Sequence, residues 1–145
     1  MLYDDLLKKM ETCPFCAEVH KKERTVFENH SAYLTYALVP YHKHHLLIIP
    51  KKHRLLLLQA TFFEQWRINR LIKKGVHLLR ALGYSDLSVL VRDGNLGKSI
   101  DHLHYHIVPN VYIGDVVNDH KPRKLLTKKQ IEKTLADFEE VKKKI

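Results

Sequence analysis

One stretch of this chain decides its fold: His102-Leu103-His104-Tyr105-His106-Ile107-Val108. Histidines alternate with apolar residues, and a period of two is typical of a β-strand. Because successive side chains of a strand point to opposite faces, we expect the three imidazoles on one face and Leu103, Tyr105 and Ile107 in the core. Eleven histidines occur in 145 residues, but chance does not readily give strict alternation closed by Pro109. The triplet therefore indicates a chemical site, since imidazole is a nucleophile, an acid or base, and a metal ligand near neutral pH.

The remaining strands predict a sheet around this stretch. We expect strands over 24–28, 31–38, 45–49 and 87–92, of which the first two form a hairpin and the third is stopped by Pro50. The connection from 87–92 to the histidine strand is short, so these two should pair antiparallel.

Two longer helices complete the predicted domain. The first is expected over 62–82, with Thr61 and Glu64 as a capping box and Gly83 as its stop. Its buried stripe should consist of apolar residues at helical spacing, namely Phe62, Trp66, Leu71, Leu78 and Leu82. The second should follow Thr127, with a stripe of Ile131, Leu135, Phe138 and Val141. A short helix is expected over 2–11. Together these elements predict an antiparallel α+β domain.

Composition limits the class of protein. A length of 145 residues with 45% apolar and 28% charged residues is typical of one globular domain, 1–145. No apolar run approaches the ~20 residues that span a bilayer, and 1–10 lacks the apolar segment of a signal peptide. We therefore expect a cytoplasmic protein without membrane partners. The net charge of +9 favours phosphate-bearing ligands, although residues 120–145 hold nine Lys or Arg against four Asp or Glu, as a solvated helix face would.

Cys13 and Cys16 form a Cys-x-x-Cys pair. In a reducing compartment this spacing favours a metal or redox role over a structural disulfide.

The histidine stretch resembles the signature of the histidine-triad (HIT) family, in which three histidines alternate with apolar residues. The resemblance extends through Cys13-Pro14-Phe15-Cys16, through His45-Leu46-Leu47-Ile48-Ile49-Pro50-Lys51-Lys52-His53, and to Gly97-Lys98-Ser99. It implies a five-stranded antiparallel sheet with the long helix packed on it, usually in a homodimer. It also implies hydrolysis or transfer of a nucleotide through a covalent nucleotidyl-histidine.

Matched by position, the resemblance assigns roles to individual residues. His104 would be the nucleophile, its ring held by a backbone carbonyl, while His45 orders the site and His106 contacts the phosphate or the leaving group. Nucleotide binding would also involve the turn residues Gly97, Lys98 and Ser99. The family usually has Gln where Lys98 stands, and Asn or Asp to hold the ribose where Ala37 stands.

The resemblance also implies a structural zinc ion. The zinc ligands of one branch of the family match Cys13, Cys16, His53 and His102. Two thiolates and two imidazoles suit a closed tetrahedral site, which would tie segment 1–23 to the sheet. A catalytic zinc on the three triad histidines is the rival interpretation, although the cysteines offer zinc a better site elsewhere.

The expected function is that of a nucleotide hydrolase or nucleotidyl transferase acting on purine nucleotide phosphoanhydrides or phosphoramidates. Dinucleoside polyphosphates and AMP conjugates are the expected substrates. Two alternatives stay open: removal of AMP from adenylated DNA ends, and a zinc-stabilised nucleotide-binding or interaction protein with weakened catalysis. Nucleic acid is the less favoured partner because no separate module for it is present. Residues 110–145 form a C-terminal extension outside any matched motif.

Overall fold

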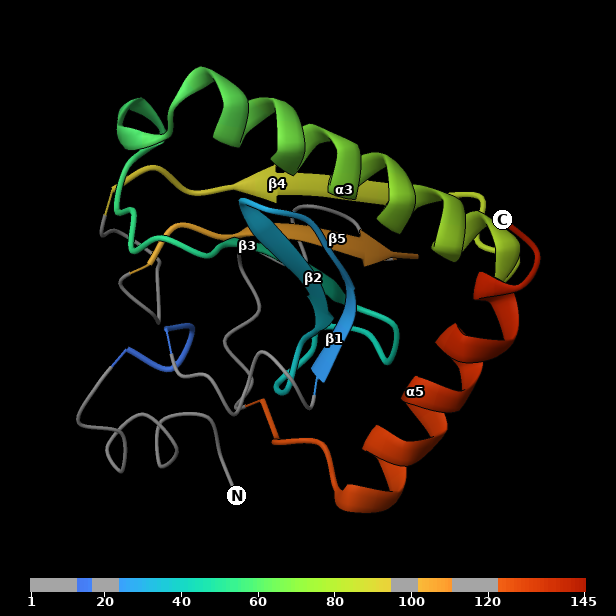
Figure 1. The fold of residues 1–145 in the computed structure, drawn as a ribbon. Coiled ribbons are helices and arrows are strands. Elements are labelled where there is room, and N and C mark those ends of the chain that lie inside the picture. The colour runs from blue at the N-terminus through green and yellow to red at the C-terminus, as the bar shows by residue number, and fades with distance from the viewer. Residues whose placement is uncertain (1–12, 17–23, 95–101, 111–122) are drawn as a thin grey trace.

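The computed structural model describes residues 13–16, 24–94, 102–110 and 123–145. Its centre is a five-stranded antiparallel sheet in the order β1-β2-β3-β5-β4. The strands are β1 (Thr25–Glu28), β2 (Ala32–Tyr36), β3 (Leu46–Pro50), β4 (Leu87–Val91) and β5 (Tyr105–Pro109). The helices within the described ranges are a short 3-10 helix η1 (Leu57–Gln59), α3 (Phe62–Ala81) and α5 (Lys128–Lys142). The long helix α3 crosses one face of the sheet and α5 packs near its C-terminal end, which confirms the predicted α+β class (Figure 1).

The hairpin and the pairing of β4 with β5 are confirmed. Asn29 closes the β1–β2 turn, because its Oδ1 accepts from the backbone N–H groups of Ser31 (3.1 Å) and Ala32 (3.0 Å). β3 begins at Leu46, one residue later than expected, so His45 lies immediately before it.

The histidine strand is shorter than predicted. β5 begins at Tyr105, so His102 and His104 precede the strand instead of lying on it. The reason is a hydrogen bond to a residue distant in sequence: the backbone N–H of Leu103 donates to the carbonyl of Arg54 at 2.6 Å, outside the sheet ladder. Leu103, Tyr105 and Ile107 are nevertheless buried in the core, as the alternation predicted.

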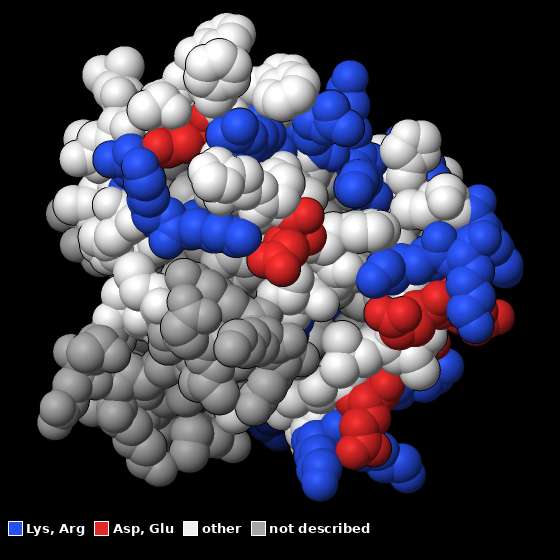
Figure 2. All heavy atoms as spheres, viewed as in Figure 1, with Lys and Arg blue, Asp and Glu red and all other residues white. Residues whose placement is uncertain are grey.

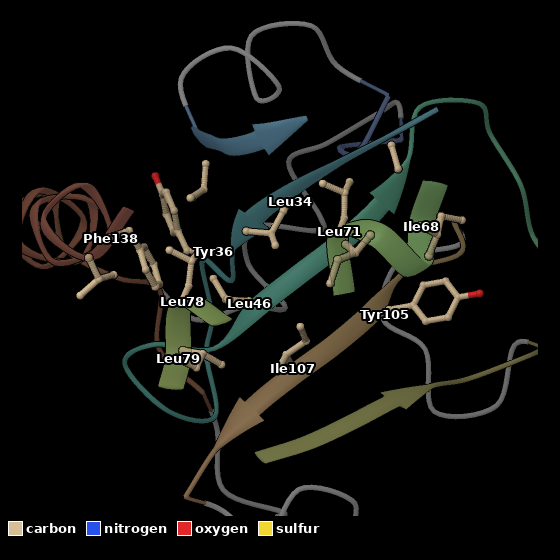
Figure 3. Close-up of a cluster of buried hydrophobic side chains, with 14 of the residues drawn as sticks. Leu34, Tyr36, Leu46, Ile68, Leu71, Leu78, Leu79, Tyr105, Ile107 and Phe138 are labelled. Carbon is tan, nitrogen blue, oxygen red and sulfur yellow. The ribbon is translucent and has the colours of Figure 1, made fainter. Parts of the chain in front are cut away.

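The core lies between α3 and the sheet. Leu71, Leu78 and Leu79 of the helix face Leu46 and Ile107 of the strands, and all are at most 1% exposed (Figure 3). Gly75 lies at the closest approach, because a Cβ there would stand 2.7 Å from Cδ1 of Ile107 and 3.0 Å from Cδ1 of Leu34. This glycine lets the helix pack directly against the sheet.

The predicted buried stripe of α3 was wrong at its N-terminal end. Phe62 and Trp66 are 79% and 48% exposed, whereas Ile68 is fully buried. The helix turns about 100° per residue. Residues 62 and 66 therefore lie on the side of the helix opposite the buried stripe that contacts the sheet. The predicted capping box is not formed, because the side chain of Glu64 is buried and forms an ion pair with Arg54 at 2.7 Å. The Thr61 N-cap is confirmed, and Leu82 is the C-cap instead of the last helical residue.

The C-terminal helix is confirmed with its predicted stripe. Thr127 and Gln130 form the capping box, and Phe138 and Val141 are buried against the core. The lysines of α5 lie mostly on the solvent side, and further cations gather over α3 (Figure 2). The expected helix over 2–11 lies outside the described residues. Within the described ranges, no helix is long and apolar enough to cross a membrane.

Candidate active site and metal site

His45 and His106 meet because β3 pairs with β5. The register places Leu47 opposite His106, and Nε2 of His45 lies 2.9 Å from Nδ1 of His106. Both side chains are buried, at 2% and 7% exposed. His106 shares the sheet face of Leu47, which is the face opposite α3, so the site and the helix lie on different sides of the sheet.

The hydrogen bonds determine which ring nitrogen carries each proton. The backbone N–H of Tyr41 donates to Nδ1 of His45 at 3.2 Å, so the proton of His45 is on Nε2. That N–H donates to Nδ1 of His106, whose own proton must then be on Nε2. The pair therefore presents a neutral N–H donor at the far side of His106.

Burial keeps both rings uncharged. Desolvation lowers the pKa of His45 to about 3, helped by the charges of Arg123 and of neighbouring histidines. Desolvation is also the main reason that the pKa of His106 lies far below its usual range, with His45 and His104 as further causes. At neutral pH the pair is a hydrogen-bonding relay of two neutral imidazoles.

His104 is half-buried beside this pair, with its ring centroid 4.7 Å from that of His106. Its Nδ1 lies 2.7 Å from the carbonyl oxygen of His102, which can only accept, so Nδ1 carries the proton. Nε2 then holds the lone pair of a neutral imidazole. This is the tautomer that a nitrogen nucleophile needs.

A separate cluster collects Cys13, Cys16, His53 and His102. Cys13 and Cys16 share a tight turn, closed by the backbone N–H of Cys16 on the carbonyl of Cys13 at 3.2 Å. The four potential ligand atoms all lie within 4.8 Å of one another. Nδ1 of His102 is 3.3 Å and 3.4 Å from the two sulfurs and 3.1 Å from Nδ1 of His53.

The distances from Nδ1 of His102 to the other three ligand atoms fit a tetrahedral metal site. Bond lengths of about 2.3 Å from zinc to sulfur and about 2.0–2.1 Å to nitrogen place the ligand atoms roughly 3.3–3.8 Å apart. Nε2 of His102 donates to the carbonyl of Pro50 at 2.8 Å, so its Nδ1 faces the cysteines unprotonated, as a ligand must. The histidines of the triad do not form a metal site of this kind. Nδ1 of His104 contacts the carbonyl oxygen of His102, and Nδ1 of His106 contacts Nε2 of His45.

Phe15 connects the two sites. Its ring, 6% exposed, lies edge-on to His102 (centroids 5.8 Å apart) and to His104 (5.2 Å). Its carbonyl accepts from the hydroxyl of Tyr33 at 2.8 Å, which anchors the turn to the sheet. Ala37 packs in the same apolar cluster, so this position offers a methyl group and no acceptor for a ribose hydroxyl.

Sequence reasoning did not identify Phe15 or Tyr41 as site residues. Tyr41 contacts His45 through its backbone N–H, and the sequence gives no sign of such a role because nearly every residue type has this group. His44, the neighbour of His45, directs its side chain to Tyr84 and Asp137 instead of to the triad. Gly97, Lys98 and Ser99 lie outside the described residues.

Comparisons with known proteins agree with this architecture. A family model described as the HIT domain matches residues 18–111. An uncharacterized HIT-like protein of Methanocaldococcus jannaschii is 28% identical over 106 residues, which cover 71% of this chain and 81% of that protein. An adenosine 5'-monophosphoramidase of Schizosaccharomyces pombe is 32% identical over 73 residues, which cover 50% of this chain and 53% of the yeast protein.

Solved structures show the same fold. A hypothetical histidine triad nucleotide-binding protein from Sulfolobus tokodaii superposes with a TM-score of 0.71 at 27% identity, covering 92% of this chain and 96% of that one. A zinc-bound histidine triad family protein from Mycobacterium smegmatis gives a TM-score of 0.63 at 20% identity, covering 92% and 98%.

Proposed function

This chain belongs to the HIT domain family, and from that premise we propose that it cleaves the phosphorus bond of an AMP conjugate, with His104 as the nucleophile. The observation that carries the proposal is the 2.7 Å contact between Nδ1 of His104 and the carbonyl oxygen of His102. It supports a neutral ring whose lone pair is on Nε2. A neutral His106, with its proton on Nε2, stands beside that ring.

The first step is attack on the α-phosphorus. The Nε2 lone pair of His104 forms a bond to phosphorus while the bond to the leaving group breaks. The electron pair of that bond stays on the leaving group, which departs as phosphate or, after taking a proton from solvent, as the free amine. The ring becomes cationic, and the carbonyl of His102 stabilises it through Nδ1–H. Nε2–H of His106 is suited to donate to a phosphate oxygen or to the leaving group, because Nδ1 is already occupied by His45.

The second step restores the enzyme. Water attacks the phosphorus of the adenylyl-histidine and the phosphorus–nitrogen bond breaks. The electron pair of that bond returns to Nε2 of His104, which becomes neutral again, while the oxygen of water leaves in AMP and the released proton passes to solvent. Phosphoryl-type transfer depends mainly on positioning and charge neutralisation. The fixed tautomers of His45, His104 and His106 meet the first requirement. The turn with Gly97, Lys98 and Ser99 stays the proposed phosphate contact.

Zinc is proposed as a structural ion on Cys13, Cys16, His53 and His102. The donor set is of the closed structural type, and the carbonyl of Pro50 orients His102 toward it. When bound, the ion would cross-link the cysteine turn to the residues around β3 and β5. The cross-link would hold Phe15 against His104, so the ion would act on catalysis through packing alone.

Among substrates we place adenosine 5'-phosphoramidate first, because the yeast relative is named for hydrolysis of that class of compound. Dinucleoside polyphosphates come second. The apolar side chain of Ala37 supports weaker recognition of the ribose. The alternative is therefore a nucleotide-binding protein with little turnover, and the assay described next distinguishes it from an enzyme.

The test compares wild type with His104→Ala and with His77→Ala, a control histidine on the exposed side of α3. Wild type and the control should release AMP from adenosine 5'-phosphoramidate, and His104→Ala should not. Mass spectrometry of the quenched wild-type reaction should find an acid-labile adenylyl group on His104. Equal turnover by His104→Ala would refute the mechanism, whereas AMP binding without turnover in wild type would favour the binding protein.

We also propose a homodimer through the edge strand β4. Val89 on this strand is 46% exposed, and the apolar side chains of Leu58 on η1 and of Phe62 at the start of α3 are 95% and 79% exposed. η1 lies next to the end of β4, because the backbone N–H of Leu57 donates to Asp93 at 3.1 Å. Light scattering should give twice the chain mass for wild type and a lower mass for Val89→Lys; a monomeric wild type would refute this proposal.

A further inference from the structure

The C-terminal segment is attached to the loop that carries His45. The backbone N–H of Leu126 donates to the carbonyl of Leu38 at 2.8 Å, and Nη1 of Arg123 donates to the carbonyl of Val39 at 3.2 Å. The guanidinium of Arg123 also lies 4.2 Å from the ring centroid of Tyr41. Both donors lie beyond residue 111, where the family match ends.

A second attachment holds the other end of the loop. Nε2 of His44 lies 2.9 Å from Oδ2 of Asp137 on α5, and these side chains are 6% and 16% exposed. A carboxylate only accepts, so Nε2 of His44 donates and Nδ1 accepts from the hydroxyl of Tyr84 at 2.5 Å. Lys133 balances the carboxylate at 2.7 Å, and Phe138 packs edge-on against His44 at 5.6 Å.

The loop between these attachments determines the state of the relay. Tyr41 supplies the N–H that fixes the tautomer of His45, and its ring stacks on His45 with centroids 5.6 Å apart. If this N–H moved away, Nδ1 of His45 could carry the proton. Nε2 would then become an acceptor, and His106 could keep the bond only by moving its proton from Nε2 to Nδ1. The donor toward the phosphate would be lost.

We propose that residues 123–142 are a brace for the loop 38–45, and that Asp137 and Arg123 are positioning residues that keep His45 and His106 in the donating tautomer. Neither side chain needs to touch substrate for this role. The effect on turnover rests on the function proposed above, whereas the effect on the tautomer does not.

Two substitutions at one position separate positioning from mere folding. Asp137→Asn keeps an oxygen that can accept from His44, whereas Asp137→Leu keeps the size but removes the acceptor. Glu139→Leu is the matched control, because Glu139 is on the same helix with a side chain 65% exposed. Arg123→Ala tests the other attachment and guards against a failure of Asp137→Leu to fold.

Two measurements on the full chain decide the proposal. Nitrogen-15 NMR of labelled histidine should show the Nε2–H tautomer for His106 in wild type, Asp137→Asn and Glu139→Leu, and a shift toward Nδ1–H in Asp137→Leu and Arg123→Ala. Steady-state kinetics should show about a tenfold lower kcat for Asp137→Leu and Arg123→Ala, with a smaller change in KM. A tenfold decrease corresponds to the loss of one positioning hydrogen bond.

Unchanged tautomers and kcat in folded Asp137→Leu and Arg123→Ala, with only a lower Tm, would overturn the brace and leave α5 a structural element. Absence of turnover in wild type would refute the proposed function instead, and the NMR result would still decide the brace.

Discussion

The close contact at Gly75 allows a quantitative prediction about how α3 rests on the sheet. Replacing Gly75 with Ala should favour the helix itself by about 1 kcal/mol, because glycine costs that much in a helix interior. The new Cβ would stand 2.7 Å from Cδ1 of Ile107 and 3.0 Å from Cδ1 of Leu34. Both neighbours are fully buried, so neither can swing into solvent. Overpacking of this kind costs about 1–3 kcal/mol, and we expect a net destabilisation of roughly 0–2 kcal/mol.

A double-mutant cycle isolates the contact. Ile107→Val removes the Cδ1 atom that meets the new Cβ, and alone should cost about 0.5–1.5 kcal/mol. In the Gly75→Ala chain the same change relieves the clash and lets the added methyl fill the space. We therefore expect the double variant to be more stable than the sum of the single effects by about 1–2 kcal/mol.

Urea unfolding followed by circular dichroism measures each free energy. Lys73→Ala, on the exposed side of the same helix, combined with Ile107→Val provides the control cycle and should be additive. If the Gly75→Ala and Ile107→Val effects add to within about 0.5 kcal/mol, the two groups do not meet and the packing argument is wrong.

Two further predictions concern the site. Cys16→Ser should lower bound zinc from about one ion per chain to almost none by elemental analysis. The core under α3 should persist by circular dichroism because it contains no ligand, and full zinc retention would contradict the assignment. His45 and His106 should make stability depend on pH, since burial lowers the pKa of His45 to about 3 and that of His106 still further below the ordinary 6.5. Below pH 6.5 the unfolded chain binds protons that the folded chain does not. The free energy of unfolding should therefore be highest above pH 6.5 and fall as the pH decreases toward 3, by up to about 1.4 kcal/mol per pH unit for each ring. Urea unfolding at several pH values should show a weaker pH dependence for His45→Gln than for wild type.

Local pattern sufficed for much of the fold. Alternation over 102–108 predicted that Leu103, Tyr105 and Ile107 are buried, and cap chemistry placed the start of both long helices at Thr61 and Thr127. Errors arose where a distant partner determines the outcome. β5 starts late because Leu103 pairs with Arg54, which lies far away in sequence.

The helix α3 shows the same limit. Its sequence offers more than one apolar stripe, and the choice depends on which side meets Leu34 and Ile107. Phe62 is therefore exposed despite its hydrophobicity.

The candidate site was predictable only where side-chain identity carries the chemistry. Cys13, Cys16, His53 and His102 could be grouped because they match the zinc ligands of one branch of the HIT family, and the structure brings their potential ligand atoms together. Two other contacts could not be predicted from the sequence. The backbone N–H of Tyr41 involves no side chain, and the contact between His44 and Asp137 joins residues that are 93 positions apart.

His102 contributes to both sites through different atoms: its ring faces the cysteines, and its carbonyl holds His104. Every amino acid has that carbonyl, so no replacement at position 102 can delete the orienting acceptor; only a shift of the main chain can. A substitution of His102 would therefore remove one of the proposed zinc ligands while the acceptor for Nδ1 of His104 stays in place.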